Sequence, residues 1–146
     1  MYPGSLTVDY LPNALGQPTQ AGTFATGVQY YPNGAIKRFT YGNGLVHTMA
    51  QNARQLPERS TDSGGVLDLG YAYDRNGNVS AITDFTVAGR QSRSMGYDAR
   101  DRLTSASSLL YPGGATYTYD VLDNVTRATV AGRDHVYWYD ANNRLT

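Results

Sequence analysis

Three short segments of the chain alternate tyrosine with another residue and then end in aspartate. They are YAYD (71–74), YTYD (117–120) and YWYD (137–140). Because successive side chains of a β-strand point to opposite faces, the two tyrosines of each segment share one face. Turn-forming residues follow the aspartate, and then a second short stretch such as NVSAITD (78–84) or NVTRATV (124–130). The pattern predicts β-hairpins, in which Asn76-Gly77 of the first copy is a strong turn signal.

The hairpin pattern recurs as an internal repeat. Each strong copy reads Tyr-Asp, three turn-like residues, one polar or basic residue, an aliphatic residue, and then serine or threonine. The four strong copies start at Tyr73, Tyr97, Tyr119 and Tyr139. An aspartate at a strand end can accept a hydrogen bond from the backbone two residues on and so close the turn. Because the frame returns at nearly fixed intervals, we predict one supersecondary unit repeated along the chain.

Weaker copies lie upstream of the strong ones. The segment YYPNGAIK (30–37) keeps the frame with Tyr31 in the aspartate position. The segment AQNARQLP (50–57) keeps it with its first two residues in place of Tyr-Asp, and PNALGQPT (12–19) retains it only faintly. Degenerate copies are expected where a repeat meets a boundary or changes partner.

A second turn is predicted after each copy, at the opposite end of the hairpin. Glycine-containing segments mark these turns at 41–44, 63–65, 87–90, 112–114 and 130–133. Two turns per repeat return the chain to its starting direction. The result is an antiparallel meander that can extend by one hairpin per repeat.

One segment allows a different interpretation. Residues 47–60, HTMAQNARQLPERS, are rich in Ala, Gln and Arg, which favour a helix. The repeat frame runs through this segment, however, and Pro57 would interrupt a helix. We therefore favour the hairpin frame over a helix here.

The predicted fold class is all-β, an antiparallel meander of stacked β-hairpins. Residues 1–29 are predicted to be a degenerate N-terminal repeat or boundary segment, and residues 30–146 a repeat region of about five to six hairpins. Because the sequence stops directly after a Tyr-Asp turn, we expect it to be a fragment of a longer chain. Its end strands would then present unpaired backbone, so we predict a homodimer or higher oligomer that forms through these edges.

The composition indicates that tyrosine supplies most of the aromatic side chains available for packing. The chain has 13 Tyr but only 3 Phe and 1 Trp, and 40% of its residues are hydrophobic. A buried tyrosine ring still has a hydroxyl that needs a partner or water, which suits a sheet with one packed face and one wet face. The 12 basic and 12 acidic residues give zero net charge without runs of one sign. We therefore expect neither a nucleic-acid partner nor binding to an anionic membrane.

Other sequence signals exclude several classes of site. The chain has no cysteine, which excludes disulfides, thiolate nucleophiles and cysteine-bound metals. No apolar stretch approaches the length of a membrane span, and no signal peptide precedes the repeats. If the protein is exported, we expect that the export signal lies elsewhere or that the chain is part of something larger.

The first strong copy also resembles a calcium loop. Asp74, Asn76 and Asn78 occupy the first, third and fifth positions, but the glycine comes at the fourth position and no glutamate follows at the twelfth. Other copies place arginine in the fifth position. We therefore predict turn closure and no metal or cofactor at this segment.

The sequence gives little support for any catalytic group. Repeated aspartates could supply a glycosidase-like carboxylate pair, but an active site is not expected to copy itself in every unit. The two histidines, His47 and His135, lie near no nucleophilic-serine motif and are expected to be surface or cross-strand residues. Asn78 and Asn124 match glycosylation sequons, but the repeat frame itself accounts for both matches.

Tyrosines form the remaining candidate site. Those expected to line up across adjacent hairpins are Tyr71, Tyr73, Tyr97, Tyr117, Tyr119, Tyr137 and Tyr139. They could form a cross-strand ladder that stabilises the sheet, which we favour, or a platform on which sugars stack. We predict no catalytic residue. The predicted structural motif is Tyr73, Asp74, Gly77, Tyr97, Asp98, Tyr119, Asp120, Tyr139 and Asp140.

The Tyr-Asp frame resembles the YD repeat of the RHS (rearrangement hot spot) family. The copies YDRNGNVS, YDARDRLT, YDVLDNVT and YDANNRLT carry the resemblance, together with the glycine turns and the YGNG segment at 41–44. It covers nearly all of residues 30–146 and is strongest from Tyr71 on. The family includes bacterial polymorphic toxins, components of insecticidal toxin complexes and animal teneurins. The resemblance implies hairpins that spiral into a hollow shell, which encloses a C-terminal toxin domain in the bacterial members.

The sequence departs from the full family pattern in two respects. It has no Asp-Pro pair, and therefore no DPxGL-type motif associated with self-cleavage, and it has no toxin domain after the last repeat. We therefore expect a non-enzymatic wall segment, secreted or at the cell surface as part of a larger protein, whose partners are the rest of its shell and the enclosed toxin domain. The alternatives are an adhesion or carbohydrate-binding module that uses tyrosine rows, and a hydrolase that uses a carboxylate pair.

Overall fold

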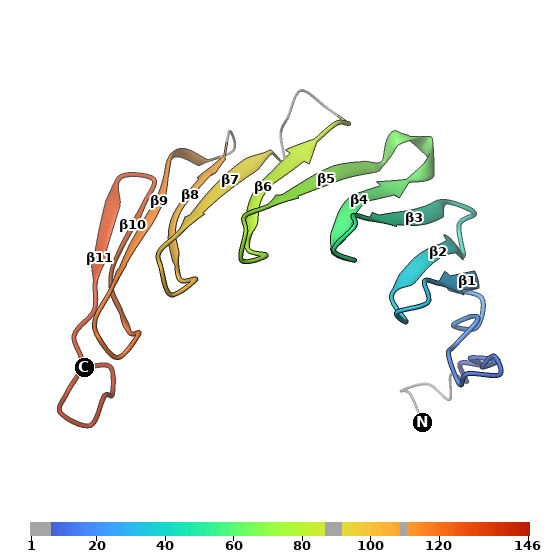
Figure 1. Cartoon of the computed structure of the whole chain (residues 1–146), viewed down its shortest axis with the longest axis horizontal. Helices are drawn as coiled ribbons and strands as arrows, with labels where there is room; N and C mark the ends of the chain where they lie inside the picture. The colour runs from blue at the N-terminus through green and yellow to red at the C-terminus, as the bar shows by residue number, and fades with distance from the viewer. Residues whose placement is uncertain (1–6, 87–91, 109–110) are drawn as a thin grey trace. The chain divides into compact units, whose positions relative to one another are not determined.

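The computed structural model describes residues 7–86, 92–108 and 111–146, and their regular structure is almost entirely β. The strands are β1 (Ala25–Tyr30), β2 (Ile36–Tyr41), β3 (Val46–Gln51), β4 (Pro57–Asp62), β5 (Leu67–Tyr73), β6 (Val79–Asp84), β7 (Arg93–Tyr97), β8 (Leu103–Ser108), β9 (Tyr111–Tyr119), β10 (Val125–Val130) and β11 (Arg133–Val136) (Figure 1). A three-residue 3-10 turn, Ser63–Gly65, separates β4 from β5. The predicted all-β meander is confirmed. None of the helical structure in the described residues is long and apolar enough to cross a membrane.

The chain divides into two compact units, residues 1–70 and 71–146. In the first unit, β1 to β4 pair in sequence order, and β4 pairs with the start of β5. In the second unit, β6 to β11 pair in sequence order as well. Each of these pairs is antiparallel, so each unit is a meander in which every strand contacts the strands next to it in the sequence.

Three of the predicted second turns are confirmed. Gly44 donates its backbone N–H to the carbonyl of Tyr41, which closes the 41–44 turn. The 63–65 segment is the 3-10 turn, and Val130 pairs directly with Arg133 across the tip of the 130–133 turn. The predicted turn at 87–90 lies outside the described residues.

The predicted turn at 112–114 is wrong, because these residues belong to β9. Gly114 has φ +60°, and a Cβ atom there would lie 2.7 Å from the carbonyl oxygen of Ala106 on β8. The register of β8 with β9 also shifts between Ala106 and Ser108. A glycine in a strand can mark a bulge and a close approach of two backbones as well as a turn, and here it marks the bulge.

The helix considered for residues 47–60 does not form. These residues belong to β3, the following turn and β4. Pro57 is the first residue of β4, a position in a strand that proline tolerates because the missing N–H costs no ladder hydrogen bond there.

The sheet has almost no enclosed core. Among the described residues, Ala128 is the one buried apolar side chain, at 6% exposure, and Ser60 and Asp84 are the buried polar ones. Burial of apolar surface normally supplies most of the free energy of folding. With so little of it here, hydrogen bonds and half-buried contacts between strands carry an unusually large share of the stability.

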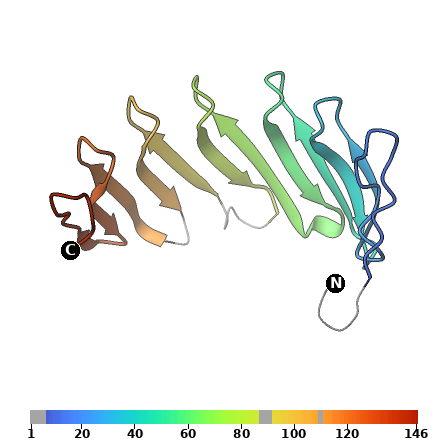
Figure 2. The same cartoon turned by 90° about the horizontal axis from the view of Figure 1, so that it is seen from below.

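Backbone pairing is uneven along the strands of the second unit. The hairpin of β7 and β8 is paired from Arg93–Ser108 to Tyr97–Leu103, next to its turn. Between hairpins, β6 pairs with β7 at Ala81–Ser94 and Ile82–Arg93, which leaves Tyr97 beyond the last of these pairs. The hairpin turns of this unit lie along the same edge of the sheet (Figure 2). At this turn edge, side chains have to join one hairpin to the next.

Candidate functional site at the turn edge

The hairpin turns share one backbone geometry. In each, the N–H of the residue in the aspartate position bonds to the carbonyl of the fourth residue after it, and its carbonyl accepts the N–H of the third residue after it. Nine turns of the described chain have both bonds. Seven occupy the Tyr-Asp frame and begin at Asn13, Tyr31, Asn52, Asp74, Asp98, Asp120 and Asp140, and the other two begin at Ala21 and, in the second turn at 41–44, at Tyr41. The faint copy at 12–19 therefore forms the same turn as the strong copies.

The third residue after the aspartate position has a positive φ in each of the seven turns of the Tyr-Asp frame. The angle is +98° at Gly77, +61° at Asp101, +68° at Asp123 and +62° at Asn143. Glycine adopts this left-handed conformation without steric cost, and Asn and Asp adopt it more readily than most other residues. The local geometry thus explains why Gly, Asp and Asn are the residues found here in the strong copies.

The repeated aspartate closes its own turn. One carboxylate oxygen of Asp98 accepts the backbone N–H groups of Arg100 at 2.9 Å and Arg102 at 3.1 Å, and its other oxygen accepts Nε of Arg102 at 2.8 Å. The other repeated aspartates, Asp74, Asp120 and Asp140, likewise accept two backbone N–H groups of their turns and the side chain of the fourth residue. These bonds supply acceptors for backbone groups that the tight turn would otherwise leave unpaired.

The weak copy at 50–57 is aligned one residue later than predicted. Asn52, and not Gln51, occupies the aspartate position, since its side-chain oxygen accepts the N–H groups of Arg54 and Leu56. The prediction matched Leu56 to the aliphatic position, whereas Pro57 takes that place at the start of β4. A glutamine side chain is one methylene longer than asparagine, so Asn52 is the residue that mimics aspartate in this turn.

Tyrosine hydroxyls join neighbouring hairpins at the turn edge. In four of these bonds the tyrosine directly precedes the aspartate position, and its hydroxyl donates to the backbone carbonyl of the aliphatic position in the preceding repeat. Tyr31, which occupies an aspartate position itself, instead donates to the carbonyl of Met49 on β3. The pairs in the second unit are Tyr97 with Val79 at 3.0 Å, Tyr119 with Leu103 at 2.7 Å and Tyr139 with Val125 at 3.0 Å. In the first unit, Tyr30 donates to Pro18 in the same way at 2.7 Å.

Polar side chains make a second connection between neighbouring turns. The fourth residue after the aspartate donates to the third residue after the aspartate of the next repeat. The pairs are Asn78 with Asp101, Arg102 with Asp123 (both 2.7 Å), and Asn124 with Asn143. We call the tyrosine bond and this side-chain bond together the turn clasp; it occurs at all three of these repeat junctions of the second unit.

Arg102 has the largest number of described contacts in the turn clasp. Its guanidinium pairs with Asp98 of its own turn and with Asp123 of the next, and it also donates to the carbonyl of Asp120 at 3.1 Å. Its centre lies 4.6 Å from the centroid of the Tyr119 ring, within the range of a cation–π interaction. The Arg102 side chain thus contacts its own turn, the next turn and the tyrosine ring that precedes the next turn.

The predicted cross-strand tyrosine ladder stays a prediction, and its described contacts at Tyr97, Tyr119 and Tyr139 are hydroxyl bonds to backbone carbonyls. The described ring contacts of Phe39, Tyr41 and His47 do not involve these tyrosines. In the sheet, β8 lies between β7 and β9, so Tyr97 and Tyr119 are separated by two strand spacings, roughly 10 Å. That separation exceeds the 4.5 to 7 Å typical of ring pairs, and each tyrosine instead bonds to the last strand of the preceding hairpin, Tyr97 to β6 and Tyr119 to β8.

Hydrogen bonds keep the repeated aspartates ionised. The pKa of Asp98 is lowered mainly by the Arg102 side chain, that of Asp120 by the Asn124 side chain, and that of Asp140 by the backbone of Arg144. Burial raises the pKa of Asp74, but hydrogen bonds from its turn outweigh it and leave the pKa lowered. A general acid needs a raised pKa, so these carboxyl groups suit hydrogen-bond acceptance better than glycosidase chemistry.

We expect the chain to lose stability in acid because of these lowered pKa values. A carboxylate whose folded pKa lies below its unfolded value of 3.8 stabilises the fold above that value, and this stability is lost as the pH falls through the folded pKa. The urea midpoint should therefore be nearly constant from about pH 7 to pH 5 and fall below about pH 4. A midpoint that does not change down to about pH 2 would contradict this interpretation.

The chain suggests a matched control for the acid experiment. Asn13 occupies an aspartate position, and its side-chain amide donates to Gln17, the fourth residue after it. The double substitution Asp120→Asn with Asn124→Gln copies this neutral pair into the second unit. We expect it to keep the turn while making the loss of stability in acid less steep.

The calcium-loop and glycosylation candidates are occupied by turn contacts. The side-chain amides of Asn76 and Asn78 both donate to Asp101, and Asn78 also donates to Asp74. Asn124 donates to Asp120 in the same way. A glycan on either sequon would replace one of these N–H donors. In the part of the chain that the structure describes, no group of three or more His, Asp or Glu side chains could hold a metal ion.

The two histidines lie where the sequence predicted. His47 forms a cross-strand pair with Asp62, with 2.7 Å between Nδ1 and the carboxylate, and its ring contacts Phe39. His135 is exposed on β11. Neither residue lies in the turn clasp.

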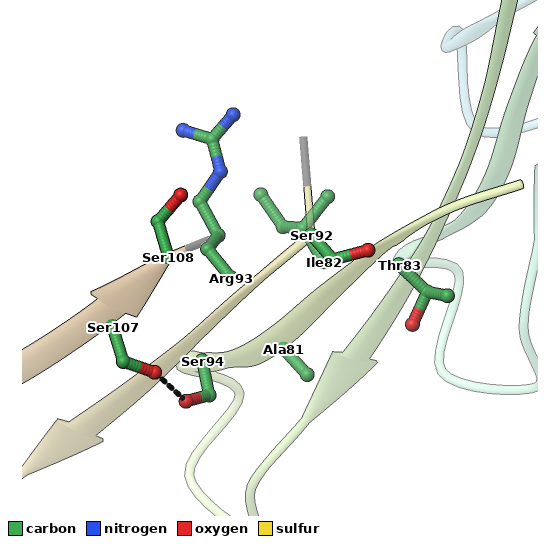
Figure 3. A pocket seen from close by; sticks show the side chains of 8 residues that line it. All are labelled: Ala81, Ile82, Thr83, Ser92, Arg93, Ser94, Ser107 and Ser108. Carbon is green, nitrogen blue, oxygen red and sulfur yellow. Dashed lines mark hydrogen bonds between the residues drawn. The ribbon is translucent and has the colours of Figure 1, made fainter. Parts of the chain in front are cut away.

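A shallow pocket lies on β6, β7 and β8, away from the turn edge. It is lined by Ala81, Ile82, Thr83, Ser92, Arg93, Ser94, Ser107 and Ser108 (Figure 3). The hydroxyls of Ser94 and Ser107 bond to each other at 2.6 Å, on the other side of the strands from Arg93 (Figure 3). This lining has hydroxyls and a guanidinium but no imidazole or carboxylate that could act as a base toward them.

Comparison with solved structures identifies the fold. Over 94% of its length the chain matches a structure of a TcdB2–TccC3–Cdc42 complex, with a TM-score of 0.75 and 19% sequence identity. It matches the Tc holotoxin pore of Photorhabdus luminescens over 92% of its length (TM-score 0.72, 20% identity). TcdB2–TccC3 without its hypervariable C-terminal region gives a TM-score of 0.69 at 20% identity, also over 92%. The resemblance to toxin-complex repeats is confirmed at the level of the fold.

The match covers only a small part of each of the solved chains. The chain spans only 8 to 9% of the length of the chains that it matches. No protein-family model and no curated protein matches the sequence.

Proposed function

We propose that this chain, which shares its fold with toxin-complex structures, is a non-enzymatic wall segment of an RHS/YD-type shell. The observation that carries the proposal is the turn clasp, which repeats from hairpin to hairpin. Each clasp uses one repeat's tyrosine and the previous repeat's carbonyl. The same contacts can therefore add repeats without limit, which is what a wall requires and what a self-contained binding domain does not.

The use of the polar groups supports a structural role. The repeated aspartates accept hydrogen bonds from their own turns, and their pKa values are lowered. The tyrosine hydroxyls at the junctions donate to backbone carbonyls. In a single copy these residues would look like catalytic or ligand-binding groups, whereas here they form hydrogen bonds that stabilise the sheet.

We further propose that the shell encloses a toxin domain and is secreted or displayed at the cell surface. This step rests on the similar structures, which are of TcdB2–TccC3 and of a Tc holotoxin pore. The other partners would be the remaining repeats of the same shell. Enclosure also suits a sheet with almost no core of its own, because a wall gains its covered face from what it surrounds.

Protease protection tests the enclosure. The full-length protein that contains this segment should shield its C-terminal domain from added protease, and the double variant Asp98→Ala, Asp120→Ala should expose that domain. Val121→Ala is the matched control, because Val121 lies in the same turn as Asp120 but is 83% exposed. Equal digestion of the double variant and the control would count against an enclosing wall.

The carbohydrate-binding alternative has its own test. Binding on a glycan array that disappears in the Tyr117→Ala and Tyr137→Ala variants would favour an adhesion module over a wall. The hydroxyl bonds of Tyr97, Tyr119 and Tyr139 argue the other way, because rings held between strands offer less surface to a sugar. Turnover of a glycan or peptide that is lost on a single Asp→Ala change would instead indicate a hydrolase.

Self-association through the sheet edges stays a prediction. The isolated chain should form a homodimer or larger oligomer, because exposed strand edges pair with one another. Static light scattering over a range of concentrations measures this directly. A mass of one chain at every concentration would show that the edges do not pair in solution.

A further inference from the structure

We propose that Asn43 is a site of spontaneous deamidation and isomerisation, and that side-chain contacts slow the same reaction at Asn33 and Asn76. These residues belong to the three Asn-Gly pairs of the chain, and all three asparagines are exposed. Because glycine has no Cβ to shield its backbone nitrogen, an asparagine that precedes glycine is especially open to attack by that nitrogen. The reaction does not depend on the proposed wall function.

The covalent steps need only the chain and water. The backbone nitrogen of Gly44 attacks Cγ of Asn43, which forms a C–N bond and closes a succinimide ring. The Cγ–Nδ2 bond breaks, and the side-chain nitrogen leaves as ammonia with the proton that the glycine nitrogen gives up. Water then opens the ring at either carbonyl, which yields aspartate or isoaspartate. The net reaction consumes water and releases ammonia, without an oxidant or a reductant.

Asn33 and Asn43 lie in closely matched turns. Gly34 and Gly44 both have φ +85°, and each donates its N–H at 2.9 Å to the carbonyl of the residue three positions earlier. The Oδ1 atom of each asparagine accepts the N–H of the second residue after it, at 3.1 Å in both turns. The backbone geometry and the Oδ1 contact therefore favour neither site over the other.

The two sites differ at the nitrogen that has to leave. The Nδ2 atom of Asn33 donates to the side-chain oxygens of Gln51 at 3.3 Å and Gln55 at 3.0 Å. Among the described residues, none accepts a hydrogen bond from the Nδ2 atom of Asn43. The amide of Asn33 must break two contacts before its Cγ can turn toward the glycine nitrogen, whereas that of Asn43 has only the Oδ1 contact that both share.

Asn76 is held more firmly than either. Its Nδ2 atom donates to the carboxylate of Asp101 at 2.7 Å, and a hydrogen bond to a charged group is stronger than one between neutral groups. The N–H of Gly77 donates to the carbonyl of Asp74 at 3.3 Å and to its carboxylate at 2.9 Å, so the attacking nitrogen is engaged twice. Conversion of Asn76 to an acid would also place a second carboxylate against Asp101.

The isoaspartate product would change the turn between β2 and β3. In isoaspartate the main chain runs through the side-chain carbon, so the backbone is longer by a methylene group. Two bonds enclose position 43, from the N–H of Tyr41 to Leu45 at 2.8 Å and from the N–H of Gly44 to Tyr41 at 2.9 Å. A longer backbone strains both bonds, so we expect isoaspartate to loosen this turn and aspartate to leave it intact.

Peptide mapping by mass spectrometry tests the assignment on the folded chain, incubated at mildly alkaline pH. We expect aspartate and isoaspartate to accumulate at position 43 about fivefold faster or more than at positions 33 and 76, because the latter must first break hydrogen bonds. The same chain in urea is the control, and unfolding should bring the three rates close together. Equal rates in the folded chain would overturn the proposal, and so would rates that keep the same ratios in urea.

Loss of the two glutamines tests the protection of Asn33. Glycine is used at position 55 because Gln55 has φ +63°, which glycine adopts without steric cost. Gln51→Ala combined with Gln55→Gly should raise the rate at Asn33 toward that at Asn43, which serves as the internal reference. An unchanged ratio of the two rates would show that the glutamine contacts do not protect Asn33.

Asp101→Gly tests the protection of Asn76. Gly77 occupies the same repeat position as Asp101 and also has a positive φ, so the substitution keeps the turn and removes the acceptor. Asp123→Gly is the matched control, because it makes the same change in the next repeat without touching Asn76. We expect faster deamidation of Asn76 in the first variant alone. If both variants accelerate it equally, loosening of the whole unit is the cause and the role of Asp101 is wrong.

Discussion

Replacement of Asp98 by alanine is expected to destabilise the second unit more than any other single substitution at the turn edge. The carboxylate accepts two backbone N–H groups of its turn and the side chain of Arg102. Without it, the two N–H groups lose their acceptor and Arg102 loses its anchor. Because Arg102 also reaches Asp123 and stacks over Tyr119, the loss extends to the next repeat. We expect Tm to fall by several degrees.

Asp98→Asn separates turn closure from charge. Asn52 shows that an asparagine oxygen can accept both backbone N–H groups in this position. At position 98, however, its amide would face the Arg102 guanidinium, donor against donor. We therefore expect thermal unfolding to rank the proteins as unsubstituted, Asp98→Asn and Asp98→Ala, from most to least stable. If Asp98→Ala were as stable as the exposed control Val121→Ala, the cap would contribute nothing measurable.

Contacts within one turn could be predicted from the sequence. Gly77 and Asn78 follow Asp74 closely in the sequence, so their backbone N–H groups can bond to its carboxylate regardless of how the rest of the chain folds. The strands that follow, β6 and β10, begin one residue inside the predicted segments 78–84 and 124–130. Local chemistry determines these features, and a repeated frame makes them visible.

Contacts between repeats could not be predicted, because they depend on the register of neighbouring hairpins. Nothing local to Tyr119 indicates that its hydroxyl reaches the carbonyl of Leu103, sixteen residues earlier. The same uncertainty explains the alignment error at Asn52, where matching one aliphatic residue outweighed the capping preference. The bulge at Gly114 also depends on how closely β8 approaches.

A further contact within the turn had a signal in the sequence. The aspartate position and the fourth residue after it vary together: Asp occurs with the side-chain donors Asn78 and Arg102, whereas Asn13 occurs with Gln17, which accepts from it. A carboxylate can only accept, while an amide side chain can both accept and donate. Matching donors with acceptors at these two positions could therefore have predicted the side-chain bond that closes each of these turns.

Removal of three hydroxyls, by phenylalanine at Tyr97, Tyr119 and Tyr139, is expected to lower the free energy of unfolding by about 3 kcal/mol. Each hydroxyl makes one hydrogen bond to a backbone carbonyl, and such a bond contributes about 1 kcal/mol net. The three bonds share no partner, so their effects should add approximately. Urea unfolding measures the loss, and the slope m should stay constant because the rings and the area they cover are kept.

Tyr117→Phe is the matched control, because Tyr117 lies on the same strand as Tyr119 but its hydroxyl is in none of the clasps. Hydrogen exchange adds a spatial test. In the triple variant, exchange should accelerate at the turn edge and remain slow at the other end of the hairpins, around Arg93 and Ser108, where the backbone ladder is continuous. Uniform acceleration along the strands would mean that tyrosine stabilises the sheet as a whole. Acceleration confined to the turn edge would show that the hydroxyls fasten repeat to repeat where backbone pairing stops.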